Sequence, residues 1–387
     1  MYSFLLVIIY IAFISLGLPD SLIGSAWPVM QTQLGVPVSF AGIITMIIAG
    51  GTIVSSLLSH RLTRKLGAGL VTAISVLMTA VALLGFSTSH SFVFLCLWAI
   101  PYGLGAGAVD AALNNYVALH YASRHMSWLH CFWGIGAAVS PYIMSYCLIG
   151  GYGWNSGYGI VGVVQIILVA LLFISLPLWK RKSTENKQGE EVTAKALSIP
   201  QALKIKGVPL ILITFFAYCA LEQTTGLWAS SYLVQYRGVD TNVAARFASL
   251  FFLGITVGRF LCGFIADKLG DKLLIRTGIL TAMIGAIFIA LPIKVDEVAL
   301  AGLIIIGFGC APIYPAIIHS TPFNFGKENS QAIIGIQMAS AYVGTTFMPP
   351  LFGMIASQIN IGLYAPYLLL FAVIMLCMSE RLNKLNS

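Results

Sequence analysis

The sequence of 387 residues is 58% hydrophobic and only 9% charged, and its mean hydropathy is +0.91. Soluble domains carry about 25% charged residues, so this composition excludes an ordinary soluble protein and indicates a chain that crosses a membrane many times. The formal net charge of +8 comes from basic residues spread at intervals, which argues against a nucleic-acid-binding surface.

Apolar runs of about 20 residues are needed to cross about 30 Å of hydrocarbon. The sequence predicts twelve spanning helices, at residues 3–30, 38–59, 68–88, 91–118, 126–149, 157–179, 208–235, 242–266, 272–291, 298–320, 329–358 and 362–379. The first run is too long for the core of a signal peptide and lacks a small-residue cleavage site. We therefore expect it to be retained as a spanning helix.

One long polar stretch, residues 180–206, divides the twelve runs six and six. Of the 21 Lys and Arg residues, 17 lie on the side of the membrane that holds this stretch, so the positive-inside rule places both termini in the cytoplasm. The predicted organisation is an N-terminal six-helix bundle (1–179), a cytoplasmic linker (180–207) and a C-terminal six-helix bundle (208–387). The predicted location is a bacterial-type inner membrane.

The two halves of the chain align at a nearly constant offset. The landmarks and their offsets are Asp20 with Glu222 (202), Gly67 with Gly270 (203), Gly103 with Gly307 (204) and Pro141 with Pro349 (208). Internal repeats of this kind are typical of transporters built from two related bundles. The fold class is therefore predicted to be all-α integral membrane, with two pseudo-symmetric six-helix bundles.

Three acids lie within the spanning segments: Asp20, Asp110 and Glu222. An ionisable side chain at membrane depth costs at least about 2.5 kcal/mol on insertion scales, so such residues usually face a cavity and serve a function. Burial without a cation disfavours the charged form of a carboxylate, which suits a group that takes up and releases a proton. We predict a proton-coupling role for all three.

Each acid also has a structural interpretation. Asp20 follows a proline and could cap a break in the first helix, whereas Asp110 could belong to an ion pair or a helix cap. Glu222 could pair with Gln223 or with a neighbouring helix. Arg259, a cation in the interior of a spanning run, is interpreted as half of a structural salt bridge, with substrate or Glu222 as alternative contacts.

Polar and aromatic side chains within the apolar runs can also bind a solute. Amides and carboxylates pair with vicinal hydroxyls, and an indole covers the apolar face of a sugar ring. The predicted substrate-binding residues are Asp20, Asp110, Asn114, His130, Trp133, Gln223, Trp228 and Gln337. Asn114 follows Asp110 by one helical turn and His130 precedes Trp133 by three residues, so each pair shares a helix face. A histidine of this kind is also typical of a helix-helix hydrogen bond, and tryptophans of packing or interfacial anchoring.

No Walker loop, HExxH motif, nucleophile elbow or other catalytic constellation occurs in the sequence. An enzyme is therefore not expected, and neither is a cofactor or a metal centre.

The segment GFIADKLGDK at 263–272 resembles the cytoplasmic loop motif of the major facilitator superfamily, and SHRLTRKLG at 59–67 is a degraded copy that lacks the acid. Four further segments are similar to the fucose:proton symporter family and its relatives: LPDSLIGSAWPVMQTQL, GLGAGAVDAALNNYV, LHCFWGIGA and LEQTTGLWASSYL. The resemblance implies proton-coupled uptake of a monosaccharide, with Asp20 and Asp110 in sugar recognition and proton coupling. Sodium is the alternative coupling ion.

Two departures from that family argue against fucose itself. Asp110 stands where the family has a glutamate, and His130 and Trp133 replace amide side chains in the fifth helix. The expected protein is a monomeric secondary transporter of the major facilitator fold whose partners are the bilayer and a small polar solute. It exposes one central site alternately to the two sides. The alternatives are a proton-coupled exporter of drugs or metabolites and a membrane sensor that does not transport.

Overall fold

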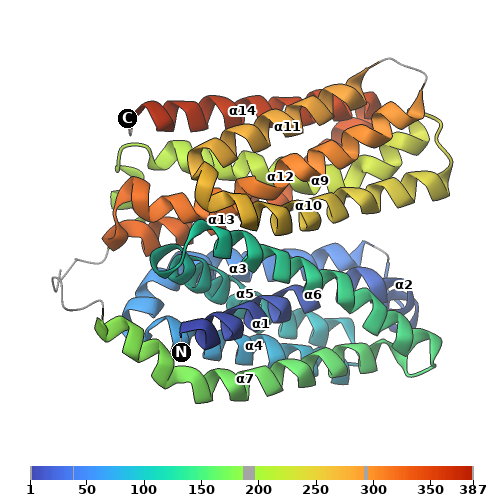
Figure 1. Cartoon of the computed structure of the whole chain (residues 1–387). Helices are drawn as coiled ribbons and strands as arrows, with labels where there is room; N and C mark the ends of the chain where they lie inside the picture. Colours follow the sequence, from blue (N-terminus) through green and yellow to red (C-terminus); the bar gives the residue numbers. More distant parts are fainter. Residues whose placement is uncertain (1, 38, 186–196, 292–294, 386–387) are drawn as a thin grey trace. The chain divides into compact units, whose positions relative to one another are not determined.

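The computed structural model describes residues 2–37, 39–185, 197–291 and 295–385, and the regular secondary structure in these ranges is helical (Figure 1). The chain forms two compact units. Unit 1 comprises residues 1–116 and 129–197, and unit 2 comprises residues 117–128 and 198–387. The end of α5 and the start of α6 therefore belong to unit 2, although both helices lie in the first half of the sequence.

The helices of the first half are α1 (Tyr2–Asp20), α2 (Leu22–Leu34), α3 (Phe40–Leu66), α4 (Ala68–Thr88), α5 (Phe92–His120), α6 (Ser123–Ile149) and α7 (Gly153–Glu185). Those of the second half are α8 (Ile199–Leu203), α9 (Val208–Gln235), α10 (Thr241–Leu269), α11 (Asp271–Ala290), α12 (Asp296–Phe325), α13 (Lys327–Ile355), η2 (Ala356–Asn360), η3 (Ile361–Leu363) and α14 (Tyr364–Leu385). The prediction of an all-α chain is confirmed. Residues 186–196 of the predicted linker lie outside the described residues.

The described residues contain eleven apolar helical runs long enough to cross a membrane. The last run, Lys327–Leu385, is 59 residues long and holds both α13 and α14. At about 1.5 Å per residue it is far longer than one crossing requires, so it accounts for two of the twelve predicted spans. The first run, Phe4–Leu34, joins α1 and α2. The chain is a multi-pass membrane protein.

Several helices extend beyond the predicted apolar limits. Helix α3, for example, continues from the predicted end at residue 59 to Leu66, with Arg64 and Lys65 in its last turn. Basic side chains interact favourably with the negative end of a helix dipole, which stabilises this polar extension.

A break separates α1 from α2 at Ser21. The backbone N–H and the hydroxyl of Ser25 both donate to the Ser21 carbonyl, at 3.2 and 2.9 Å, and start the new helix. The Asp20 side chain makes no capping bond to this break, so the alternative structural interpretation of Asp20 does not hold.

In unit 1, α4 packs against α7, and α1 packs against α7 as well. The α4–α7 contact is aromatic near one end, where the Phe86 ring stacks on Tyr158 with centroids 5.2 Å apart. Trp27 and Met30 of α2 are buried in the same cluster. This core holds together the helices that carry Asp20 and Asp110.

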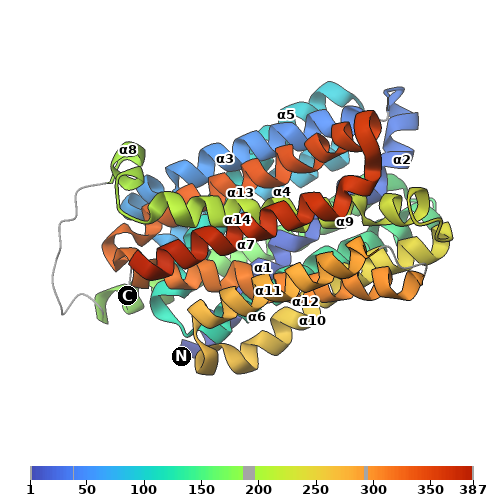
Figure 2. The ribbon, with the colours of Figure 1, turned by 90° about the horizontal axis from the view of Figure 1, so that it is seen from above.

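In unit 2, α9 packs against α13 and α14, and α12 packs against α10 and α11 (Figure 2). Small residues permit the close α11–α12 contact, because a methyl group on Gly309 would strike the backbone of Ala282. Tyr364 stacks on Tyr232 at 4.9 Å, and its hydroxyl donates to the Thr225 carbonyl at 3.1 Å. These contacts bury the centre of α9, where Glu222 lies.

The internal repeat also appears in the helix contacts of each unit. In unit 1, a side chain on Gly103 would strike the Ile48 carbonyl, and in unit 2 a side chain on Gly307 would strike the Phe251 carbonyl. Ile48 and Phe251 are themselves 203 residues apart, so both members of the contact are duplicated. The duplication therefore extends from sequence landmarks to helix packing.

Candidate functional site

Asp20, at the end of α1, is exposed although it lies within the apolar run Phe4–Leu34. The indole N–H of Trp133 donates to its Oδ2 at 2.9 Å, and the hydroxyl of Tyr102 donates to its Oδ1 at 3.2 Å. Both donors are neutral, and Asp20 has no ion-pair partner among the described residues. The carboxylate is thus held in place by neutral donors, without a cation.

Close packing of α1 against α6 brings Trp133 to Asp20. A methyl group on Gly17 would strike the carbonyl oxygen of Trp133, and one on Gly136 would strike the carbonyl of Ile14. Both contacts join backbone to backbone, which only glycine permits. Gly17 lies one turn before Asp20, so the closest approach of the helices fixes the indole near the carboxylate.

Substitution of Gly17 by Ala is expected to separate α1 from α6, at a cost of about 1–3 kcal/mol in stability. The measurement is the thermal unfolding of the purified protein. Gly24→Ala in α2 is the matched control, because a methyl group there meets no atom within 4 Å. Alanine is the better helix former, so the control should retain or gain stability. Equal stability of the two variants would contradict the proposed packing.

Asp110 and Asn114 form the predicted pair on one face of α5. The Asn114 amide donates to Asp110 Oδ1 at 2.7 Å and to the Asp110 carbonyl at 3.0 Å. His130 Nε2 of α6 lies 3.0 Å from Asn114 Oδ1. Because the amide oxygen is an acceptor, Nε2 is the protonated ring nitrogen. A hydrogen-bonded series therefore runs from Asp110 through Asn114 to His130.

Helix α6 contributes to both carboxylate clusters. Trp133 binds Asp20 directly, and His130, three residues earlier, reaches Asp110 through Asn114. The His130 and Asn114 side chains are buried, whereas Asp110 is half-buried. The predicted shared face of His130 and Trp133 is thus the face that joins these two clusters within unit 1.

Sequence reasoning does not single out Tyr102, the second donor to Asp20. A tyrosine beside a proline in an apolar helix is typical of packing, and nothing local distinguishes it. Its role depends on the contact between α5 and α1, which links residues 82 positions apart.

Glu222 is buried in unit 2 beside Arg259. The Arg259 NH2 group lies 3.6 Å from Glu222 Oε1 and donates to the Tyr218 hydroxyl at 3.3 Å. The guanidinium also lies 6.0 Å from the centre of the Tyr314 ring. The predicted salt bridge of Arg259 is present, and its partner is Glu222. A proton-coupling role for Glu222 stays a prediction.

The other predicted residues of unit 2 do not form one cluster. Gln223 is exposed on α9, and the Trp228 indole donates to the Pro349 carbonyl at 2.9 Å and packs against Phe352. Gln337 is fully buried on α13, where its Oε1 accepts from the Thr321 hydroxyl at 3.1 Å. Its Nε2 group has no hydrogen-bond partner in the described structure.

The family model of the Major Facilitator Superfamily matches residues 9–295 and 212–381. The chain belongs to this superfamily. It is therefore a transporter and not an enzyme, as the loop motif at 263–272 suggested.

Two of the curated relatives are named for different solutes. The chain is 23% identical over 327 residues to the glucose/mannose transporter GlcP of Bacillus subtilis, covering 81% of this chain and 78% of the relative. It is 23% identical over 341 residues to the cis,cis-muconate transport protein of Acinetobacter baylyi, covering 84% and 80%. With Bypass of stop codon protein 6 of Saccharomyces cerevisiae it shares 24% identity over 282 residues, or 67% of this chain and 56% of that protein.

Solved structures show the same fold. A transporter named FucP, in an outward conformation, matches with a TM-score of 0.82 at 15% identity, covering 97% of this chain and 98% of FucP. The proton:xylose symporter XylE matches with a TM-score of 0.77 at 14% identity, covering 99% and 95%. The predicted major facilitator fold is confirmed.

Proposed function

We propose that this transporter is a proton-coupled symporter of a small polar solute, most simply a monosaccharide. The observation that carries the proposal is Asp20, an exposed residue inside a spanning run whose carboxylate is held by two neutral donors. Such a group can accept hydrogen bonds from solute hydroxyls in its charged form and can also take up a proton.

The two donors differ in whether they can accommodate a proton on the Asp20 oxygen that they contact. The indole of Trp133 can only donate, so Oδ2 keeps its hydrogen bond only while it remains an acceptor. The Tyr102 hydroxyl can both donate and accept, so it can turn and accept from a proton on Oδ1. We therefore assign Oδ1 as the oxygen that takes the coupling proton.

A neutral solute fits unit 1 better than an anion. Residues 1–60 contain no Lys or Arg, and Asp20 has no ion-pair partner among the described residues, so the Asp20 cluster offers no cation to a solute carboxylate. In unit 2, Arg259 is already paired with Glu222. Sugars present hydroxyls to carboxylates and amides and an apolar face to an indole. GlcP supports the same solute class among the relatives.

The muconate transport protein supports organic acids as the second candidate. An acid would have to draw Arg259 away from Glu222.

The proposed setting is a bacterial-type inner membrane with both termini cytoplasmic, in accordance with the Lys and Arg distribution. The protein is proposed to act as a monomer and to use no cofactor beyond the coupling ion.

The test is uptake into proteoliposomes that contain the purified protein, with panels of sugars and organic acids under a proton or a sodium gradient. Accumulation of a sugar that requires the proton gradient supports the proposal. Uptake that requires a sodium gradient would show that the coupling ion is sodium instead of the proton. Uptake of organic acids without uptake of sugars would show that the solute is an acid. Transport of cationic amphiphiles out of cells, without sugar uptake, would instead support an exporter. Binding without flux would support a sensor.

Substitution of Trp133 by Phe is expected to weaken solute affinity, because the Asp20 carboxylate loses the donor that holds its Oδ2 in place while the aromatic ring is retained. The measurement is the solute concentration at half-maximal uptake. Trp154→Phe is the control, since that indole donates to the neutral amide of Gln33 at 2.7 Å. An unchanged affinity in Trp133→Phe would show that the Asp20 cluster does not bind the solute.

A further inference from the structure

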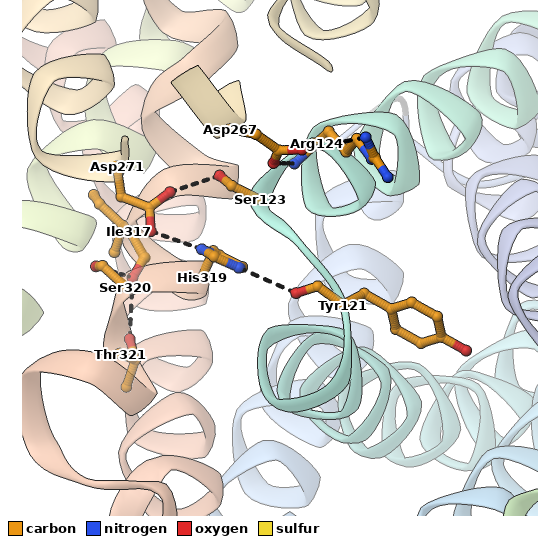
Figure 3. Close-up of polar contacts among 9 residues, drawn as sticks. All are labelled: Tyr121, Ser123, Arg124, Asp267, Asp271, Ile317, His319, Ser320 and Thr321. Atoms are coloured by element: carbon orange, nitrogen blue, oxygen red, sulfur yellow. Dashed lines mark hydrogen bonds and ion pairs between the residues drawn. The ribbon is translucent and has the colours of Figure 1, made fainter. Parts of the chain in front are cut away.

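The short connection between α5 and α6, which belongs to unit 2, is held to α10, α11 and α12 of that unit by a set of polar contacts (Figure 3). Ser123 donates its hydroxyl to Asp271 Oδ1 at 2.6 Å. The backbone N–H of Arg124 donates to Asp267 Oδ1 at 3.0 Å, and its guanidinium lies 3.5 Å from Asp267 Oδ2. Both acids lie in the segment ADKLGDK that joins α10 to α11.

His319 of α12 completes this set, and both of its ring nitrogens face acceptors. Nδ1 lies 2.6 Å from Asp271 Oδ2, and Nε2 lies 3.2 Å from the carbonyl oxygen of Tyr121 (Figure 3). A neutral imidazole carries one N–H group and one lone pair, so it can satisfy only one of these oxygens. An imidazolium carries two N–H groups and satisfies both. The geometry fits the protonated ring.

We propose that His319 is a second proton-binding site of this transporter, separate from the acids of the spanning helices, and that its protonated form fastens the α5–α6 connection to α11 and α12. Loss of the proton leaves either the Asp271 or the Tyr121 oxygen opposite a lone pair. One of the two hydrogen bonds of the ring is then lost, and the attachment of the connection to α11 and α12 is weakened.

Two acids lie around His319. Asp271 of α11 contacts the ring directly, and Asp267 at the end of α10 belongs to the same set of polar contacts. The nearest cation of the set, Arg124 of α6, is directed to Asp267, and its Nε also contacts His125. On α12 itself, the neighbouring Ser320 donates to the Ile317 carbonyl and carries no charge. The His319 and Asp271 side chains are only 21% and 16% exposed, so solvent screens their attraction weakly.

This site lies at the end of α12 that continues to the Gly326 turn, on the side that the Lys and Arg distribution assigns to the cytoplasm. The fraction of His319 side chains that carry a proton would then follow the proton concentration on that side. The state of the α5–α6 connection would thus report cytoplasmic acidity independently of solute binding at Asp20.

The test is hydrogen exchange of peptides covering residues 117–128, followed from about pH 5 to pH 8, the range in which histidine commonly titrates. After correction for chemical exchange, protection in the wild-type protein should fall about tenfold or more as the pH rises, the loss expected for a hydrogen bond to a charged group. His319→Gln should show the low protection at every pH. His90→Gln, at an exposed histidine between α4 and α5, should behave as wild type.

Two further variants separate His319 titration from general weakening of the contact. Ser123→Ala removes the other hydrogen-bond partner of Asp271. The protection of residues 117–128 from hydrogen exchange should therefore fall at every pH, while the further decrease on deprotonation of His319 remains. Asp271→Asn should reduce protection at low pH, because the carboxylate of the ion pair is lost. Unchanged protection of α4 peptides establishes that each variant is folded. A pH step that persists in His319→Gln, or no step in the wild type, would overturn the proposal. The readout needs no transport, so its outcome is independent of the proposed symport.

Discussion

Replacement of Asp110 by Asn is expected to abolish uphill accumulation of the solute under a proton gradient, while exchange of solute between the two sides continues. The amide can still accept a hydrogen bond from Asn114, so the local structure is retained. It cannot gain or lose a proton, so the energetic link between proton and solute movement is removed. Internal solute should reach the external concentration and rise no further.

The measurement compares proton-driven uptake with counterflow exchange in proteoliposomes. Glu380→Gln is the control, since Glu380 is an acid near the end of α14 that pairs with Arg276. This control should accumulate solute as the wild type does. Retained uphill uptake in Asp110→Asn would transfer the coupling role to Asp20 or Glu222.

Substitution of Arg259 by Ala is expected to cost about 3–5 kcal/mol of stability, the loss typical when one partner of a buried ion pair is removed. The Arg259 and Glu222 side chains are only 4% and 10% exposed. Without the guanidinium, the Glu222 carboxylate must remain charged and unpaired or become protonated. The Tyr218 hydroxyl also loses its contact with Arg259. The measurement is the midpoint of thermal unfolding.

Arg276→Ala is the matched control, because the Arg276 and Glu380 side chains are 42% and 30% exposed and exposed pairs contribute about 0–1 kcal/mol. A double variant, Arg259→Met with Glu222→Leu, should recover much of the lost stability, because no unpaired charge then remains buried. If Arg259→Ala were as stable as Arg276→Ala, the pair would not have a structural role, and Arg259 would be available to a solute.

Local periodicity explains why part of the candidate site was predictable. Asp110 and Asn114 are four residues apart on one helix, so their contact follows from helix geometry once the segment is known to be helical. The buried cation Arg259 required a partner at membrane depth, and the acids within the spans were few. Glu222 was therefore among the expected contacts.

Contacts between distant helices could not be predicted in the same way. Tyr102 and Trp133 meet Asp20 only because α1 packs closely on α6 and contacts α5, and no spacing in the sequence records that packing. His319 and Asp271 are 48 residues apart, and the two acceptors of the ring come from separate elements.

The sequence by itself determined the membrane class, the helical spans, the internal repeat and the superfamily, because each depends on composition and on periods along the chain. The tertiary structure decided which donors hold Asp20, that Glu222 is paired with Arg259, and that His319 faces two acceptors. The physical reason is that a hydrogen bond depends on ångström-scale distances between side chains, and those distances are set by how closely neighbouring helices pack.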